Sequence, residues 1–581
     1  MIYSINSNKP QFRKVEFKPG FNVVLATRTE QSSDKDSRNG LGKSTLIDIV
    51  HFLLGKSLTE RLPKQRLEDW VFSMTFDLGS DRVTVSRGLK DTKKVNVEGL
   101  LQQLPETLEK YRTQIGYEVT PSQWSKTLGY FQFGLELEND QTYSPSYASL
   151  INYFSRRNGT RGGYSDPFKH SNKQQPFDVK INNSFLLGLG WEFSRKYHLL
   201  KDRGKVLQQI RKEAHSGLLS NILGVISQLD SERIRLEEKT KNEETALRNY
   251  KPLQQYDQFV RESNELTGEI HQSLNNRKEF EFLLQAYEKN LTEEEDVEPS
   301  LVARLYEEAK VEIPTPVIRR LEEVKEFNKI IIKNRKEFLK NEINRIKEEI
   351  RRLIIQIEEK TNKRAEFNGL IRSHKSYDEY EELIRLHQIT LGELENTKNK
   401  ILNMKKFEEG KRELDKDIEV LVKDANLDLM ERETQRKSAI LKYNEYSQYL
   451  YEVKGDLNIG FTEKGLELNV NIERSGSSGI DNMKIFCYDM VLADIWSRKN
   501  ISPWFLIHDS VMFDPVDERQ KAKALQLAWL ESKKDTYQYI CMLNSDDVPY
   551  NEFEKNFDFD RYVALELTDA SPEGSLLGFR F

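Results

Sequence analysis

The sequence predicts an α/β protein in which one mixed head domain is interrupted by a long antiparallel helical hairpin. Both ends of the chain combine short apolar strands with turns and helices. The middle, from about residue 195 to residue 451, is instead rich in Lys, Glu and Arg and follows a helical period. Charged residues make up 31 % of the 581 positions and apolar residues only 37 %, so much of the chain must be solvated helix. We therefore expect the two ends to assemble into one head.

Residues 1–194 carry the first half of the predicted head. Strand patterns cover residues 12–17, 21–27, 70–78 and 81–89. A loop rich in Ser and Asp follows the second of these strands, and an apolar helix closed by Gly55 comes next. A phosphate-binding loop needs this order of buried strand, loop and helix.

The central residues are predicted to form two helical arms. Their clearest apolar seam consists of Ile332, Leu339, Ile343, Ile346, Ile350, Leu353 and Ile357, whose later members are spaced as in a heptad repeat. Three prolines lie within residues 292–317, and no proline occurs from Val317 to Ser502. We expect an outgoing arm over 195–291, a turn over 292–317 and a returning arm over 318–451. Pro252 and residues 367–369 are candidate joints.

Residues 452–581 carry the second half of the predicted head. Alternating apolar positions on either side of a turn at residues 462–465 predict a β-hairpin. Further along, the pattern predicts a helix, a strand, a second helix and a second strand over residues 479–496, 504–508, 518–530 and 537–543. This alternation matches the mixed character of the N-terminal part.

The stretch SRNGLGKST, residues 37–45, has the spacing of a phosphate-binding loop except that Ser37 stands where the first glycine is usual. Gly40 and Gly42 let the backbone approach a phosphate closely, Lys43 adds a positive charge, and Ser44 can hold Mg²⁺. The start of the following helix adds its amides and dipole. The stretch predicts an ATP and Mg²⁺ site, and the alternative is a glycine turn with a capping serine.

Two features near the C-terminus complement this loop. The apolar strand in PWFLIHDS ends at Asp509, a carboxylate suited to the Mg²⁺ shell. Residues 475–479, SGSSG, form a small-residue loop before a helix, which can meet phosphate through backbone amides. The alternative for that loop is a flexible connector.

A phosphate loop, a coiled-coil hairpin, a signature-like loop (residues 475–479) and an acidic strand end together resemble the SMC/RecN type of ABC ATPase. The block GIDNMKIFCYDMVLADIW with PWFLIHDSVMFDPVDERQ resembles, more narrowly, a bacterial SMC-like branch with a C-terminal domain of unknown function. That branch often occurs in antiphage defence systems. The resemblance implies a split ABC-type head and a dimer whose heads enclose two ATP molecules.

The resemblance also assigns residues to the ATP site. Nucleotide contacts within one chain fall to Arg38, Asn39, Gly40, Gly42, Lys43, Ser44 and Thr45, and contacts across the dimer to Ser477, Ser478 and Gly479, with Ser475 and Gly476 as another register. A glutamine is expected beside Mg²⁺, and Gln132 and Gln141 are the candidates. Arg156, Arg157 or Arg161 are candidates for phosphate or DNA contact, with a solvated basic loop as the alternative.

The chain departs from that family's pattern at the position of the general base. Ser510 follows Asp509 where a glutamate is usual, and Asn544 stands where a histidine is usual. A serine is not a base at neutral pH, so Asp514 or Asp517 is expected to replace it. We assign catalysis to Asp509 and Asp514. If no aspartate replaces the missing general base, we expect slow hydrolysis, with ATP acting as a dimerisation switch.

Composition sets limits on partners and location. The net charge of -5 gives no general attraction to nucleic acid, so DNA contact requires a local patch. Two cysteines exclude a disulfide framework and a four-cysteine zinc site, and no apolar run approaches ~18 residues. We expect a cytoplasmic ATPase that dimerises through its heads, contacts DNA and regulates a separately encoded effector in genome maintenance or antiphage defence. The alternative is a nucleotide-gated coiled-coil scaffold with little hydrolysis.

Overall fold

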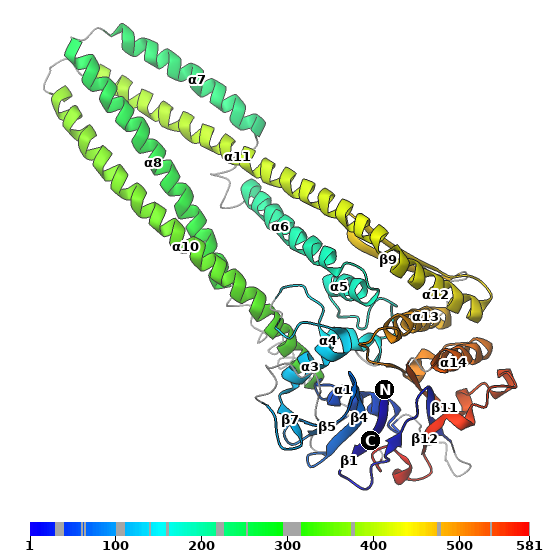
Figure 1. Cartoon of the computed structure of the whole chain (residues 1–581). Helices are drawn as coiled ribbons and strands as arrows, with labels where there is room; N and C mark the ends of the chain where they lie inside the picture. The colour runs from blue at the N-terminus through cyan, green and yellow to red at the C-terminus, as the bar shows by residue number, and fades with distance from the viewer. Residues whose placement is uncertain are drawn as a thin grey trace. The chain divides into compact units, whose positions relative to one another are not determined.

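The computed structural model divides into two compact units, which are described separately (Figure 1). The head unit comprises residues 1–198, 314–319 and 418–581, and the helical unit comprises residues 199–313 and 320–417. The structure describes residues 1–28, 40–59, 62, 66–99, 111–138, 141–157, 162–216, 226–250, 254–293, 315–372, 378–472, 478–534 and 537–579.

The head unit contains a parallel sheet built from both ends of the chain. Its strand order is β10 (Phe505–His508), β11 (Gln538–Asn544), β3 (Phe21–Thr27) and β12 (Val563–Thr568), and every neighbouring pair is parallel. β3 comes from the N-terminal part and lies between two strands of the C-terminal part. Its first six residues are buried, as its continuous apolar sequence predicts. The expected assembly of the two chain ends into one mixed α/β head is confirmed.

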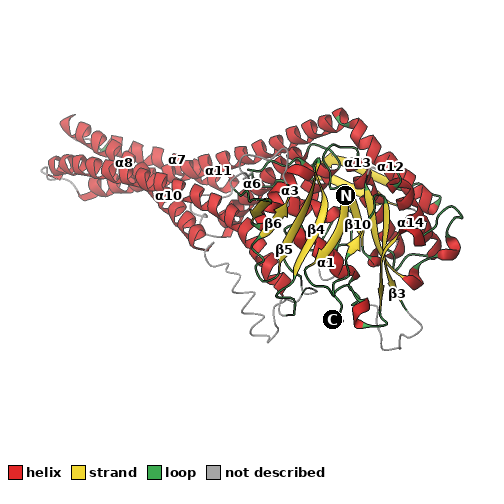
Figure 2. Cartoon of the chain, turned by 60° about the horizontal axis from the view of Figure 1, so that its bottom comes forward, coloured by secondary structure: helices red, strands yellow, loops and turns green. Residues whose placement is uncertain are grey.

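An antiparallel sheet accompanies it in the head (Figure 2). Its order is β2 (Val15–Glu16), β1 (Ile2–Ser7), β4 (Val71–Leu78), β5 (Asp81–Gly88), β6 (Val95–Glu98) and β7 (Gly116–Val119). β4 and β5 alternate buried and partly exposed residues, which is why their sequences predict strands. The strand predicted over residues 12–17 is shorter in the structure, where only Val15 and Glu16 form β2, paired with β1. The predicted hairpin forms from β8 (Asp456–Thr462) and β9 (Gly465–Asn471).

Helices cover these sheets. The head contains α1 (Lys43–Leu53), α3 (Pro121–Phe133), α4 (Tyr147–Leu150), α5 (Pro176–Leu186), α12 (Glu433–Tyr451), α13 (Ser478–Ser497) and α14 (Glu518–Ser532). Short 3₁₀ turns are η1 (Ile151–Tyr153), η2 (Ser510–Met512), η3 (Ser545–Asp547), η4 (Tyr550–Glu552), η5 (Asp560–Tyr562) and η6 (Pro572–Gly574). α1 packs against β4 and β5, α13 against β10, and α14 against β3 and β11. α12, assigned from the sequence to the returning arm, instead packs against α13, α14 and β8 within the head.

The helical unit contains α7 (Ile226–Asn249), α8 (Gln254–Glu293) and most of α10 (Thr315–Arg372) and α11 (Asp378–Glu431), and α6 (Trp191–Ser216) leads into it. Lys360 of α10 pairs with Glu269 of α8 at 3.0 Å. Lys347, nearer the start of α10, pairs with Glu288, nearer the end of α8, at 2.8 Å. α8 and α10 therefore run antiparallel.

α11 lies beside two of these helices. Its residues Gln388 and Asn403 donate hydrogen bonds to Asn264 and Glu279 of α8, in the same chain order, so α8 and α11 are parallel. Lys398 of α11 contacts Glu237 of α7, whereas His387 contacts the later residue Glu243, so α7 and α11 are antiparallel. The chain thus reverses between α7 and α8 and again between α10 and α11, and Val260, Ile371 and Tyr380 pack together at that end.

These reversals correct the predicted single hairpin. The outgoing arm, residues 195–291, reverses direction between Asn249 at the end of α7 and Gln254 at the start of α8, and the candidate joint Pro252 lies outside the described residues. α10 continues through Gly369, around which a side chain would meet open space, so this glycine lowers helix stability without ending it. The predicted turn over residues 292–317 falls largely outside the described residues. The seam itself is present, with Ile343 and Ile346 buried.

None of the described helices combines the length and the apolar character that a membrane crossing requires.

Candidate nucleotide-binding site

The described part of the phosphate loop begins at Gly40, and the expected contacts of Arg38 and Asn39 lie outside the described residues. Gly40 has φ 111° and Gly42 has φ 105°, a left-handed conformation that strains any residue with a side chain. A Cβ on Gly42 would also lie 2.5 Å from the Cβ of Leu576. The amide of Leu576 donates to the carbonyl of Leu41 at 2.8 Å. The C-terminal segment therefore packs directly against the loop and requires glycine there.

Lys43, Ser44 and Thr45 are the first residues of α1. Gly42 is the N-cap and supplies no side-chain cap, and the first turn contains no acidic residue. The first amides of a helix have no partner within the helix, and together with the helix dipole they favour an anion. The loop and the helix start thus have the local geometry of a phosphate site.

Two strand ends of the parallel sheet face this helix start. Asp509 directly follows β10, and Asn544 ends β11. The carboxyl ends of parallel strands meet at one edge of a sheet, which is where open α/β folds bind ligands. Ser44 Oγ donates to Asp509 Oδ2 at 2.7 Å, across 465 positions of sequence. Lys43 Nζ donates to Asn544 Oδ1 at 2.5 Å, so the predicted residues Lys43, Ser44 and Asp509 gather at one place.

Acidic groups surround the same strand ends. Asn544 Nδ2 donates to Asp547 Oδ2 at 2.7 Å, and the buried Lys521 lies 3.8 Å from Asp547 Oδ1. Burial raises the pKa of Asp514, as do the charges of Asp547 and Asp509, while Lys521 and Lys43 oppose this shift. Asp514 is therefore within electrostatic reach of the site.

The other candidate base has a structural role. Asp517 is the N-cap of α14 and accepts a hydrogen bond from the Arg519 amide at 3.0 Å. The Ser510 amide donates a hydrogen bond to Asp509 Oδ1 at 2.8 Å. Of the two alternatives that the sequence left open, the surroundings favour Asp514.

The signature-like loop is described only at its end. Ser475, Gly476 and Ser477 lie outside the described residues, and α13 begins at Ser478. Gly479 is buried, and a Cβ there would lie 2.5 Å from the carbonyl oxygen of Pro515. Asn482 Nδ2 donates to the Val511 carbonyl at 2.8 Å. The start of α13 thus packs on the segment that follows Asp509.

Gln132 makes no hydrogen bond to Asp509 among the described residues, and the assignment of a glutamine to the Mg²⁺ shell stays a prediction. Gln132 is fully buried in α3, and neither polar atom of its side chain has a hydrogen-bond partner among the described residues. Gln141 is exposed. The hydrogen bonds that the described residues make to the Asp509 carboxylate and amide come instead from Ser44, Ser510 and Tyr164.

Arg156 is not available to phosphate or DNA. Its side chain is fully buried, and it donates to both carboxylate oxygens of Asp489 on α13, at 2.6 and 2.7 Å. Arg157 lies 3.7 Å from Asp48 of α1. Arg161 falls outside the described residues. The backbone before Arg156 extends the sheet, because the Ile507 amide donates to the Phe154 carbonyl at 2.8 Å.

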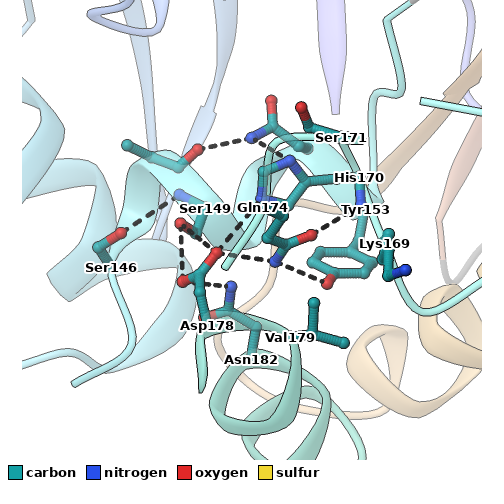
Figure 3. A network of polar contacts seen from close by, with 12 residues as sticks. Ser146, Ser149, Tyr153, Lys169, His170, Ser171, Gln174, Asp178, Val179 and Asn182 are labelled. Atoms are coloured by element: carbon teal, nitrogen blue, oxygen red, sulfur yellow. Dashed lines mark hydrogen bonds and ion pairs between the residues drawn. The ribbon is translucent and has the colours of Figure 1, made fainter. Parts of the chain in front are cut away.

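A polar network supports the segment that follows (Figure 3). Gln174 Nε2 donates to Tyr153 Oη at 3.2 Å and to Asp178 Oδ2 at 2.8 Å. Ser149 and Asn182 also donate to the Asp178 carboxylate. Sequence reasoning missed both this network and the Arg156–Asp489 pair. The pair joins residues 333 positions apart, and the network has no local sequence pattern although its Ser149–Asp178 contact spans only 29 positions. The aromatic residues Tyr153 and Phe154 shortly before Arg156 were the available signal that this segment is buried.

Fold and site together define a mixed α/β head with a phosphate-loop geometry and a long helical unit. Among known proteins, the family model "Uncharacterised protein conserved in bacteria (DUF2326)" matches residues 446–581. Over 601 residues the chain is 20 % identical to "Uncharacterized protein YydD" of Bacillus subtilis (strain 168), covering 97 % of this chain and 96 % of that protein. The C-terminal block that carried the narrower resemblance therefore lies within the residues that this family model matches.

Two solved structures are also similar. One is the Smc head domain with a coiled coil and joint derived from Pyrococcus yayanosii, with a TM-score of 0.35, 14 % identity and coverage of 95 % of this chain and 93 % of that chain. The other is the Smc head domain with an extended coiled coil bound to the C-terminal domain of ScpA derived from Pyrococcus furiosus, with a TM-score of 0.33, 11 % identity and coverage of 95 % and 91 %.

Proposed function

We propose that this chain is an SMC-like ATPase whose head binds Mg-ATP. The observation that carries the proposal is the contact of Ser44 Oγ with Asp509 Oδ2 at 2.7 Å, at the start of a helix whose N-cap is a glycine. A hydroxyl and a carboxylate that meet beside a phosphate loop are the protein ligands that Mg²⁺ combines with substrate phosphates. Neither the hydroxyl of Ser44 nor the carboxylate of Asp509 would by itself indicate a Mg²⁺ site.

Each residue of the loop has a role. The backbone at Gly40 and Gly42 and the first amides of α1 hold the phosphates, with Arg38 and Asn39 flanking them. Lys43 leaves Asn544 to neutralise the β- and γ-phosphates, and Thr45 holds the first turn. Ser44 and Asp509 hold Mg²⁺, which when bound neutralises charge on the phosphates.

Asp514 accepts the proton of the attacking water. The water oxygen forms a bond to the γ-phosphorus while the bond to the ADP oxygen breaks, and the proton passes to the Asp514 carboxylate. The pKa of Asp514 is raised by burial and by neighbouring Asp547 and Asp509, which makes it a stronger base than an ordinary aspartate. Ser510 cannot take this role.

The assembly follows from the sequence resemblance. Two heads engage face to face, and Ser477, Ser478 and Gly479 of one chain meet the ATP of the other. DNA contact and control of a separately encoded effector, in the cytoplasm and in genome maintenance or antiphage defence, extend the same proposal.

A scaffold that binds ATP and barely hydrolyses it is the second candidate. Ser510 at the usual position of the base favours it. Both candidates require Mg-ATP binding, and they differ in turnover.

Steady-state ATP hydrolysis by the full chain, with and without DNA, tests the proposal. We expect turnover in the natural chain and none above background in Lys43→Ala. Lys14→Ala is the matched control, because Lys14 forms an exposed ion pair with Glu16 in the same head. ATP binding without turnover would favour the scaffold, and equal turnover in the natural chain and Lys43→Ala would refute the assigned site.

A further inference from the structure

We propose that Tyr164 is a positioning residue that fixes the backbone of Asp509 and thereby aims its carboxylate at the Mg²⁺ position. This inference rests on the proposed function. It assigns to the loop after Arg156 a task that neither the sequence pattern nor the phosphate-loop motif indicates.

The contact lies at the point where the strand ends. Asp509 follows His508, the last residue of β10, and its amide donates to Tyr164 Oη at 3.1 Å. The Asp509 carboxylate is occupied by Ser44 and Ser510, so the amide is the separate point at which its backbone is held. A phenol can accept one hydrogen bond and donate another. Tyr164 does both, since its hydroxyl donates to the Arg156 carbonyl at 3.4 Å.

The phenol stays protonated in this place. Burial raises the pKa of Tyr164, and the Asp509 charge raises it further. A protonated hydroxyl keeps its donor for Arg156 and its lone pair for the Asp509 amide.

Arg156 holds the loop that carries Tyr164. Its guanidinium donates to the carbonyls of Gly163, Pro167 and Lys169 at 2.9, 2.6 and 2.6 Å. The same guanidinium is paired with Asp489 in the buried interior. A buried arginine with these partners is costly to displace, because its charge would lose them without gaining water. Tyr164 is thus presented from a fixed loop.

Asp489 also contacts the residue next to Asp509. His508 Nε2 lies 3.2 Å from Asp489 Oδ2, and His508 Nδ1 lies 2.9 Å from Tyr539 Oη. One carboxylate on α13 therefore reaches Asp509 by two routes, through His508 along β10 and through Arg156 and the Tyr164 loop. α13 begins at the end of the signature-like loop. A shift of α13 is expected to change the position of Asp509.

The far end of the loop is held as well. Tyr153 Oη donates to the Phe168 carbonyl at 2.7 Å. The His170 amide donates to Gln174 Oε1 at 3.0 Å (Figure 3). Both ends of residues 162–170 are therefore anchored by buried or half-buried groups. Tyr164 lies between these two held ends, so its hydroxyl is fixed relative to the backbone of Asp509.

Tyr164→Phe tests this assignment because it removes only the hydroxyl. Tyr147→Phe is the matched control: Tyr147 is buried in the same head, and its hydroxyl has no hydrogen-bond partner among the described residues. We expect ATP binding in EDTA to be unchanged in both variants. We expect the Mg²⁺ concentration for half-maximal stimulation of ATP binding to rise about fivefold in Tyr164→Phe only, the loss of one ordinary hydrogen bond.

Hydrogen exchange provides a second readout that does not depend on nucleotide. The Asp509 amide, followed in peptides covering residues 505–512, is expected to exchange faster in Tyr164→Phe and not in Tyr147→Phe, with peptides from β3 unchanged in both. Unchanged exchange at Asp509, or an unchanged Mg²⁺ requirement in a chain that binds Mg-ATP, would overturn the inference. Failure of the natural chain to bind Mg-ATP would instead refute the proposed function, and the exchange result would still decide the role of Tyr164.

Discussion

Asp514 is the carboxylate whose surroundings best suit proton transfer at this site. Its pKa is raised by burial and by Asp547 and Asp509, whereas Asp517, three residues later, is committed to capping α14. These two aspartates therefore differ in role although they share one short segment. That difference makes a paired substitution informative.

We expect Asp514→Asn to lower the ATP turnover number by at least about 100-fold, the usual contribution of a general base. ATP affinity should change little, because the neutral side chain still fits. Asp517→Asn is the control, since asparagine caps a helix nearly as well as aspartate. Turnover numbers and ATP affinities of both variants check this. Equal turnover in the two variants would contradict the assignment of Asp514.

His508 gives a prediction about pH. Burial lowers its pKa below the ordinary value of 6.5, and Arg156 adds to this while Asp489 opposes it. Above pH 6.5 the histidine is neutral in both folded and unfolded chains, so its contribution to stability is fully present. As the pH falls below 6.5, the unfolded chain binds the proton first, and stability declines by up to about 1.4 kcal/mol per pH unit.

The free energy of unfolding of the natural chain should therefore fall more steeply between pH 6.5 and 5.5 than that of His508→Gln. Denaturant unfolding at several pH values measures both slopes. Glutamine keeps a polar side chain in the same place and removes the titration. Identical slopes in the two proteins would show that His508 does not stay neutral in the fold.

The sequence predicted which residue types the site uses, and left out their supporting contacts. Lys43, Ser44 and Asp509 could be found because a phosphate loop and an acidic strand end have local patterns. The Tyr164 contact with Asp509 has no such pattern, because it depends on a loop held from α13 across the head. Gln132 was chosen by residue type alone, and its burial in α3 could not be seen from its neighbours in sequence.

At the scale of elements, the antiparallel packing of α8 on α10 gives a direct prediction. Ser263 Oγ of α8 lies 3.1 Å from Asn368 Oδ1 of α10. The double variant Ser263→Cys with Asn368→Cys should form a disulfide under mild oxidation, because two short side chains in contact place the cysteines within bridging range. Mobility on non-reducing gels and mass spectrometry of the linked peptides measure it.

The control pair is Ser263→Cys with Arg345→Cys. A single hairpin that turned near the middle of residues 292–317 would bring these two positions together, whereas the observed packing does not join them. Linkage of the control pair in place of the first would contradict the observed register of α8 on α10.

Strands and helices with strong patterns were predicted nearly to their ends, as β3, β5, α13 and α14 show. The direction of the long helices was not predicted. An amphipathic seam shows that one face of a helix is buried, but it does not show which helix covers that face. The sequence of residues 318–372 suits packing against one helix or against two. The fold of the helical unit therefore depends on contacts between distant segments, such as Ser263 with Asn368.

For the whole molecule, the proposal requires two copies to meet through ATP. Ser477→Arg places a long charged side chain where the signature-like loop would meet the ATP of the second copy. We expect this variant to bind Mg-ATP as a monomer and to lose ATP-dependent dimerisation. Asn551→Arg, an exposed position elsewhere on the head, is the control. Light scattering with and without Mg-ATP measures it, and dimerisation retained in Ser477→Arg would place the contact in another segment.

Titration of Mg-ATP into the full chain by calorimetry tests the central claim most directly, because the claim is that both ends of the sequence build one nucleotide site. We predict saturable binding at one site per chain in the natural protein, and its loss in Lys43→Ala from one end and in Asp509→Ala from the other. Lys14→Ala should bind normally. Binding that survives both Lys43→Ala and Asp509→Ala, or no binding by the natural chain, would contradict the account.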